Sequence, residues 1–403
     1  MGKVACNRGV ARVIIKPRIR NNICLTAHPE GCARLVSAQI DYATSRGPLD
    51  GPANILVIGS STGYGLAARI VAAFAYGAKT VGVALEKPGS PLRVGSAGWY
   101  NSASFDRSAA AAGRGSWSIN GDAFANETKD EAVALIKKHM GRVELVVYSL
   151  ASPVRPGPAG GALFRSVLKP VGNRARVKTV DLTTEQVSEV ALEPATEEEI
   201  ENTIKVMGGE DWDLWMQALE AGDALSAGAT TVAFSYVGPP LTFPFYRGAT
   251  IGKAKEDLEA TARRLREHLA RRGGSAYVSV NKAVVTKAGA VIQGFPLYAS
   301  ILYRVMKERG VHEGPIEQMF RLFAERLFAQ GGVPEDCEGR IRLDDLEMRE
   351  DVQEQVRRRW YEATTENLRE IADLAGFRRE FLNLSGFAVE GIDYEADVDP
   401  SGW

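Results

Sequence analysis

Short apolar runs separated by helical stretches recur along much of the chain. Residues 55–58 are continuously apolar, as expected of a strand that is covered on both faces of a sheet. Comparable runs occur at 80–85, 144–148, 229–234 and 277–280. Strands that alternate with helices in this way predict right-handed crossovers and an α/β fold built on a doubly wound, Rossmann-type parallel sheet.

Two other patterns differ from this alternation of strands and helices. Partial alternation of apolar and polar residues at 177–182 and 186–192, on either side of a short polar turn, predicts a β-hairpin insertion. The last third of the chain is dominated by helical patterns, so we predict a helix-rich C-terminal part. These stretches lie at 295–307, 316–330 and 351–375.

The remaining organisation is simple. Residues 13–17 are typical of a short strand, and 37–46 are typical of a helix that leads into the central strand. Residues 1–12 contain no acidic side chain and no clear amphipathic period, so we interpret them as a flexible extension. Because 13–403 contain no internal repeat, low-complexity tract or Pro/Gly/Ser-rich linker, we predict one large domain with embellishments.

The central predicted strand, 55–58, ends in a glycine turn. Gly59, Gly63 and Gly65 are followed by an apolar helical stretch at 66–74. Such a turn lets the backbone approach a pyrophosphate, and the helix N-terminus offers amide donors and the positive end of a dipole. This G-x-x-x-G-x-G spacing is the variant found in short-chain reductases and favours nucleotide binding. A glycine-rich turn in any other parallel α/β protein is the alternative.

The next predicted strand, 80–85, is followed directly by Glu86. A carboxylate at this strand end can accept hydrogen bonds from the adenosine ribose hydroxyls and would repel a 2′-phosphate. Glu86 therefore favours NADH over NADPH. The neighbouring Lys87, and a longer separation from Gly59 than is usual, leave open that Glu86 is an ordinary surface residue.

Length and charge limit the remaining possibilities. The chain has 403 residues, 45% hydrophobic and 25% charged, and a formal net charge of −1, which gives no general attraction to nucleic acid or an anionic membrane. No stretch approaches the roughly 18 apolar residues of a membrane span, and no secretory signal opens the chain. The four cysteines have no zinc-ligand spacing with the histidines, so we predict no metal site, and reduced thiols in the cytoplasm.

Candidate acids lie just after the predicted strand at 229–234. Tyr236 and Tyr246 follow this strand, and Lys255 stands on a helical stretch whose apolar residues recur at steps of three and four. Lys255 is in phase with those apolar residues and shares their face. Lys253 lies on a polar face of the same stretch, so we expect it to be solvated.

The candidate acid and the lysine are not neighbours on a helix. Eight residues separate Tyr246 from Lys255, which on one continuous helix would place them on opposite sides, so a loop must bring the tyrosine in. An adjacent ammonium stabilises a phenolate and lowers its pKa from about 10, and a phenol O–H can stabilise negative charge produced by hydride addition. Lys255 can also hold the nicotinamide ribose. Tyr236 is the rival acid, or it contacts the substrate carbonyl.

These features resemble the FabV-type enoyl-[acyl-carrier-protein] reductases and the closely similar trans-2-enoyl-CoA reductases. The likeness extends from about residue 14 to residue 400 and includes the Tyr-x8-Lys element at Tyr246 and Lys255. Together the matching stretches are far more specific than the glycine turn alone. The other stretches are IIKPRIRNNICLTAHPEGC, LVIGSSTGYGLAARI, GSAGWYNSA, SINGDAF, VVYSLASP, VMGGEDW and FLNLSGF.

The resemblance implies NADH-dependent reduction of the 2,3 double bond of a trans-2-enoyl thioester, on acyl carrier protein or CoA, in fatty acid synthesis. Hydride would pass from nicotinamide C4 to the β-carbon, Tyr246 would stabilise and help protonate the enolate, and Lys255 would orient cofactor and phenol. A monomer is also implied. The residues implied to bind the cofactor are Gly59, Ser61, Tyr64 and Gly65 at the pyrophosphate, Glu86 at the ribose, Asp122 and Ala123 at the adenine, Leu150 and Ala151 at a strand end, and Lys255 and Thr286.

Two other functions are compatible with the residue patterns. A ketoreductase of the short-chain type would use the same Tyr–Lys pair on the C=O group of a 3-oxoacyl thioester. A non-catalytic NADH-binding protein would bind the dinucleotide without turnover of any acyl thioester. The ordered tyrosine–loop–lysine arrangement argues against the second of these.

Overall fold

A parallel sheet forms the centre of the computed structural model, which describes residues 13–20, 23–157, 161, 163–287 and 289–403. The predicted extension at residues 1–12 lies outside the described residues. The sheet has seven strands. In chain order they are β3 (Asn54–Ile58), β4 (Lys79–Ala84), β5 (Ser116–Asn120), β6 (Val143–Tyr148), β11 (Leu225–Ser235), β12 (Ser275–Val280) and β13 (Arg340–Arg342).

The strand order places the carboxyl ends of β3 and β6 at the middle of the molecule. Side by side the strands run β13-β12-β11-β6-β3-β4-β5, and each of these pairings is parallel. The chain therefore reverses its direction of travel across the sheet between β3 and β6. Ligands of open parallel sheets bind outside the carboxyl ends at such a switch point. The predicted doubly wound sheet is confirmed.

Alternate residues of the central strand face two different cores. Ile55 and Val57 are buried in the core on one face, whereas Leu56 and Ile58 are buried in the core on the other. The first core is formed with α1 (Pro29–Thr44), α2 (Gly63–Ile70), the π-helical turn η1 (Val71–Ala75), α3 (Ala97–Ala111), α9 (Pro315–Arg321) and η4 (Leu322–Leu327). The second is formed with α4 (Asn126–His139), α6 (Glu210–Ala221) and α7 (Thr250–Ala270). The helix α5 (Glu197–Met207) packs on α7.

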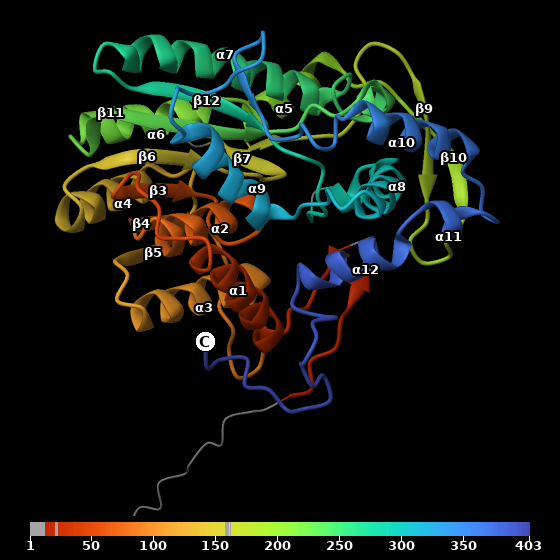
Figure 1. Ribbon diagram of the computed structural model, residues 1–403, viewed down its shortest axis with the longest axis horizontal. Coiled ribbons are helices and arrows are strands. Elements are labelled where there is room, and N and C mark those ends of the chain that lie inside the picture. The colour runs from red at the N-terminus through yellow and green to blue at the C-terminus, as the bar shows by residue number, and fades with distance from the viewer. Residues whose placement is uncertain (1–12, 21–22, 158–160, 162, 288) are drawn as a thin grey trace, which may run out of the picture.

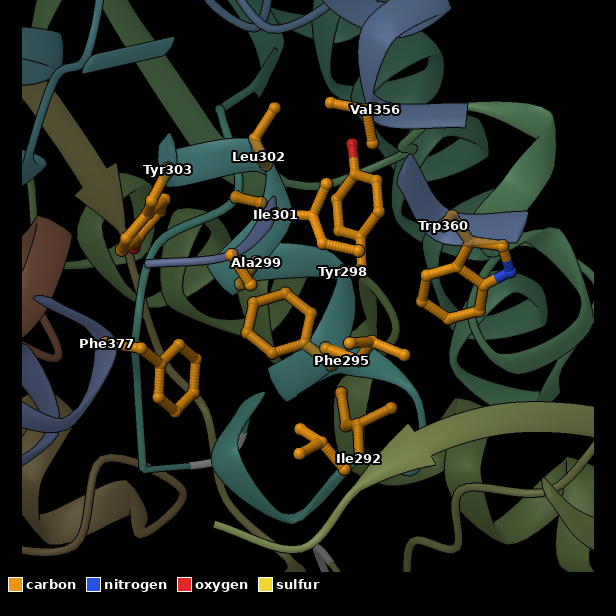
Figure 2. Close-up of a cluster of buried hydrophobic side chains, with 14 of the residues drawn as sticks. Ile292, Phe295, Tyr298, Ala299, Ile301, Leu302, Tyr303, Val356, Trp360 and Phe377 are labelled. Atoms are coloured by element: carbon orange, nitrogen blue, oxygen red, sulfur yellow. The ribbon is translucent and has the colours of Figure 1, made fainter. Parts of the chain in front are cut away.

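A third core lies beside the sheet and is centred on α8 (Phe295–Glu308). Figure 1 shows α8 grouped with the C-terminal helices and a hairpin on one side of the molecule. Those elements are β9 (Ala175–Val180), β10 (Val187–Leu192), α10 (Glu350–Glu362), α11 (Leu368–Ile371) and α12 (Leu374–Asn383). β9 and β10 pair antiparallel, with Val187 opposite Val180, so the predicted hairpin is confirmed. Figure 2 shows the aromatic and aliphatic side chains that fill this core.

Several local predictions were wrong. The first helix, α1, begins at Pro29 and not at residue 37, because the ring of His28 caps it by accepting a hydrogen bond from the Gly31 amide. Residues 13–17 form no strand, and only a single bridge joins Val13 to Val398. The long helix predicted at 351–375 is instead divided among three helices. The described residues also form small elements outside the main pattern: β1 (Ile19–Arg20) with β2 (Ile23–Cys24), β7 (Val154–Pro156) with β8 (Leu163–Arg165), and β13.

The described part of the chain contains no helix that is both long enough and apolar enough to cross a membrane.

Candidate active site

The glycine turn joins β3 to α2 with backbone in close contact. Gly59 has a φ of +84°, and a Cβ there would lie 2.3 Å from the carbonyl oxygen of Ser149. A Cβ on Gly65 would lie 2.0 Å from the carbonyl oxygen of Gly59. Thr62 precedes the helix and makes no side-chain capping bond, so the amides of the first turn remain available to an anion. This geometry fits a pyrophosphate.

Glu86 is held against this turn. The Ser61 hydroxyl donates a hydrogen bond of 2.7 Å to Glu86 Oε1, which brings two predicted cofactor residues into contact. Asn120, at the end of β5, pairs with the backbone of Glu86 through its side-chain amide, at 2.7 and 3.0 Å. Gly98 lies under the carboxylate, since a Cβ there would be 1.9 Å from Glu86 Oε1. The carboxylate is therefore fixed at the carboxyl edge of the sheet.

Asp122 and Ala123 form the turn that follows β5. Asp122 Oδ1 accepts from the Phe124 amide at 3.0 Å, and the carbonyl of Ala123 accepts from Lys129 Nζ and from the Trp215 indole, both at 3.0 Å. Lys129 is itself buried and pairs with Asp211 at 2.9 Å. A buried ion pair thus supports this turn from the protein side.

The residues predicted at the other strand ends lie on the same edge. Leu150 and Ala151 follow β6, and the preceding residue, Ser149, donates its amide to the Ile58 carbonyl at 2.8 Å. Thr286 lies in the irregular segment after β12, where its hydroxyl accepts from the Gly289 amide at 2.9 Å.

The side chain of Tyr64, which we expected at the pyrophosphate, makes other contacts in the structure. It belongs to the first turn of α2, but its hydroxyl donates to the carbonyl of Lys282 at 2.6 Å and lies 3.0 Å from Gln318 Oε1. The phenol therefore ties the helix of the glycine turn to the segment that follows β12. Only the backbone of Tyr64 is left for a contact at the pyrophosphate.

The two candidate acids lie in contact. Tyr236 is the first residue after β11, and Tyr246 follows the 3₁₀ turn η2 (Pro240–Phe245). Their rings meet edge to face with centroids 4.7 Å apart. The turn before α7 therefore carries Tyr246 and places its ring against Tyr236 at the carboxyl end of β11.

The two lysines of α7 differ as their phase predicts. Lys255 Nζ turns inward and donates to the carbonyl of Phe234, the penultimate residue of β11, at 3.1 Å. Lys253 is 43% exposed and pairs with Glu256 on the surface of the same helix. Lys255 is therefore the lysine that reaches the carboxyl end of β11.

One electrostatic prediction was wrong. We expected Lys255 to lower the pKa of Tyr246, but burial raises this pKa above its ordinary value. The ammonium of Lys255 points to the Phe234 carbonyl, and burial lowers the pKa of Lys255 to about 8. Tyr246 is therefore a neutral phenol at physiological pH and is suited to donate a proton.

A buried carboxylate beside this site was missed by sequence reasoning. Glu347 lies between β13 and α10, has no exposed surface, and accepts a hydrogen bond of 2.9 Å from the Tyr236 hydroxyl. It belongs to no motif that we recognised, and 111 positions separate it from Tyr236. Only the packing of the C-terminal helices places it there.

Three family models match consecutive parts of the chain. "NAD(P)H binding domain of trans-2-enoyl-CoA reductase" matches residues 14–91, and "Trans-2-enoyl-CoA reductase catalytic region" matches residues 93–328. "Enoyl reductase FAD binding domain" matches residues 335–398. In that last segment the buried side chains of α10 and α12 pack against α8 as one apolar core. This packing does not fit a flavin site, and the chemistry proposed for this chain uses no flavin.

Relatives resemble the chain over nearly its whole length. It is 56% identical to the enoyl-[acyl-carrier-protein] reductase [NADH] of Flavobacterium johnsoniae and 52% identical to the trans-2-enoyl-CoA reductase [NADH] of Ruminiclostridium cellulolyticum, each over 96% of this chain and 98% of the relative. The crystal structure of Treponema denticola trans-2-enoyl-CoA reductase in complex with NAD superposes with a TM-score of 0.93 at 50% identity, covering 96% of this chain and 98% of that one. The chain therefore belongs to the family of trans-2-enoyl-CoA reductases and FabV-type enoyl-[acyl-carrier-protein] reductases.

Proposed function

We propose that the protein reduces the 2,3 double bond of trans-2-enoyl thioesters with NADH, as a step of fatty acid synthesis. The observation that carries this proposal is the position of Tyr246, a buried neutral phenol in contact with Tyr236 at the carboxyl end of β11. The likeness to enoyl reductases supports a C=C substrate over the C=O substrate of a ketoreductase, and it supports turnover over binding alone.

NADH, when bound, supplies the hydride that is added to the β-carbon. The glycine turn offers the amides of α2 to the pyrophosphate, and Glu86, oriented by Ser61, is placed to accept hydrogen bonds from the adenosine ribose. The further residues that would line the cofactor site are Asp122, Ala123, Leu150, Ala151 and Thr286.

Tyr246 acts on the thioester carbonyl. Hydride addition at the β-carbon moves negative charge to this oxygen, and a hydrogen bond from the Tyr246 O–H stabilises that charge. Because burial keeps the phenol protonated, Tyr246 can also donate its proton to the enolate, which then becomes the saturated thioester. General acid catalysis of this kind contributes about 10²–10⁴-fold.

Lys255 organises this corner of the site. Its ammonium is anchored on the Phe234 carbonyl, which leaves further N–H groups for the nicotinamide ribose hydroxyls. Burial lowers the pKa of Lys255 to about 8, so the side chain is cationic below that pH.

The carrier and the assembly are parts of the same proposal. Named relatives act on acyl carrier protein or on CoA, and we propose that this chain accepts enoyl groups on one of these carriers, as a cytoplasmic monomer. The assay follows NADH consumption with one enoyl chain on each carrier, beside the matching 3-oxoacyl thioester. We expect turnover of an enoyl substrate only. NADH consumption with the 3-oxoacyl thioester alone, or with none of the three, would overturn the assignment.

A further inference from the structure

Glu347 is a hub for three hydrogen-bond donors from three distant parts of the chain. Its Oε1 accepts from the hydroxyls of Tyr236, at 2.9 Å, and Tyr298, at 2.6 Å. Its Oε2 accepts from the amide of Ala283 at 2.7 Å. A carboxylate can accept all three bonds, because it has acceptor sites on both oxygens and no proton of its own.

The bond to Ala283 fixes the role of Oε2. Residues 281–285 follow β12, are buried, and belong to no regular element, so their amides need acceptors from other parts of the chain. Gln318 accepts from the Lys282 amide at 2.8 Å, and Tyr303 accepts from the Val285 amide at 2.9 Å. Glu347 serves the amide between these two. Oε2 must therefore remain an acceptor.

Oε1 of Glu347 accepts a hydrogen bond from the Tyr298 hydroxyl, and the partners of Tyr298 fix the direction of this bond. Gln353 donates to the backbone carbonyl of Glu347 at 2.7 Å, which orients its amide, and it also donates to the Tyr298 hydroxyl at 3.3 Å. Tyr298 therefore accepts from Gln353 and sends its own proton to Glu347. Figure 2 shows Tyr298 on the side of α8 that faces Val356, with Tyr303 on the other side. Tyr298 is fully buried, and its hydroxyl also lies within reach of the Tyr236 hydroxyl.

A phenol has one proton, and this limits what Tyr236 can do. While its O–H donates to Glu347, Tyr236 cannot donate to a substrate oxygen and can only accept there. Tyr246 lies against Tyr236 edge to face, and its hydroxyl donates to no other group in the described residues. Of these two phenols, Tyr246 is then the one whose proton is free.

We propose that Glu347 is a positioning residue that takes the Tyr236 proton and so leaves Tyr246 as the single phenol that donates to the substrate. This inference rests on the proposed function. It explains why two tyrosines in contact are not interchangeable, and it assigns the C-terminal segment a part in the reaction, since that segment carries the carboxylate.

Replacement of the Glu347 carboxylate by an amide should reverse the direction of the hydrogen bond between residue 347 and the Tyr236 hydroxyl. In Glu347→Gln the amide oxygen must face the Ala283 amide, because an NH₂ group there would meet another donor. The NH₂ group then occupies the place of Oε1 and donates to the tyrosine oxygens. Tyr236 can no longer give its proton to position 347, and that proton turns toward the substrate.

The experiment compares variants in the Tyr246→Phe background, with NADH and crotonyl-CoA. We expect Tyr246→Phe alone to be slow, and Tyr246→Phe/Glu347→Gln to recover about tenfold in kcat, a fraction of the 10²–10⁴-fold that a general acid contributes. A third substitution, Tyr236→Phe, should abolish the recovery. A role for Glu347 confined to structure predicts no recovery at all.

Asp344→Asn is the matched control. Asp344 is another fully buried carboxylate of the same connection, and it pairs with Arg342 without touching Tyr236. It should give no recovery in the Tyr246→Phe background. An equal recovery in this control, or a well-folded double variant that binds NADH and shows none, would overturn the inference. Full activity of Tyr246→Phe alone would instead refute the proposed function.

A second measurement does not require Glu347→Gln to fold. Protonation of Glu347 also blocks its acceptance of the Tyr236 proton. Tyr236 is partly exposed, so its hydroxyl can turn this proton toward the substrate instead. Burial raises the pKa of Glu347; of the charged groups that face it, Lys282 lowers this pKa and Asp344 raises it. Residual kcat of Tyr246→Phe should therefore rise several-fold on acidification, while the wild type does not. A parallel fall in both would contradict the inference.

Discussion

The glycine turn and Glu86 are near neighbours in the sequence, whereas the proposed acid side of the site is assembled from distant segments. Ser61 reaches Glu86 across 25 positions, within one strand–helix–strand unit. Tyr236 reaches Glu347 across 111 positions, and Ala283 reaches it across 64. The first region depends on backbone shape, which glycine spacing records. The second depends on which side chains the folded core brings together, and substitutions should therefore affect the two regions in different ways.

The largest effect is expected where backbone approaches backbone. In Gly65→Ala the new Cβ would overlap the Gly59 carbonyl at 2.0 Å, so the turn must open. A distortion of about 2–3 kcal/mol raises the KM for NADH about 100-fold, with little change in the KM for the enoyl thioester at saturating NADH. Gly113→Ala is the control, because Gly113 has a φ of +65° but open space around its Cβ position. It should lower Tm only, and an unchanged KM for NADH in Gly65→Ala would refute the role of the turn.

The lysines of α7 provide the matching test of the acid side. Lys255→Met removes the inward ammonium, and we expect kcat to fall about 10- to 100-fold through lost stabilisation of developing charge. Lys253→Met removes an exposed lysine that pairs only with Glu256, and it should retain nearly full activity. Steady-state kinetics of both variants measure the difference. Equal losses would show that the inward orientation of Lys255 has no catalytic meaning.

The pH dependence of kcat/KM provides a further test of the role of Lys255. Burial lowers the pKa of Lys255 to about 8, so the side chain is charged below this pH and neutral above it. If the cation is the active form, kcat/KM falls as pH rises through about 8. Burial also lowers the pKa of Lys282 to about 8, and Lys255→Arg separates the two, because arginine stays charged. A fall that persists in Lys255→Arg would assign the titration to another group.

The smallest effect is expected at Glu86. A carboxylate at the adenosine ribose would repel the 2′-phosphate of NADPH, but Glu86 is partly exposed, so solvent would weaken the repulsion. Glu86→Ala should shift the ratio of kcat/KM for NADH and NADPH about tenfold toward NADPH, a change of about 1.4 kcal/mol. Glu354→Ala, on the exposed face of α10, should leave the ratio unchanged. No shift in Glu86→Ala would assign cofactor choice to other residues.

Much of the sheet could be predicted from the sequence, because a strand covered on both faces must be apolar on both. The run at residues 55–58 identified β3 within one residue, and the helix predicted after the glycines begins three residues later than α2 does. The phase of Lys255 and Lys253 was also predictable, since helical periodicity assigns each residue to a face.

What could not be predicted depends on contacts between distant segments. The sign of the pKa change at Tyr246 followed from an assumed proximity to Lys255, whereas the structure directs that ammonium to Phe234. Tyr64 belongs to the glycine-turn motif, but its hydroxyl donates a hydrogen bond to the carbonyl of Lys282. Glu347 has no local pattern, because its importance lies only in the three donors that converge on it.

The most direct measurement is the kcat of Tyr246→Phe with NADH and crotonyl-CoA, beside Tyr361→Phe as a control at an exposed tyrosine. If the Tyr246 proton stabilises and quenches the enolate, Tyr246→Phe loses about 10²-fold or more in kcat, while NADH affinity and Tm stay near those of the wild type. Tyr361→Phe keeps full activity. A Tyr246→Phe variant as active as Tyr361→Phe would contradict the account.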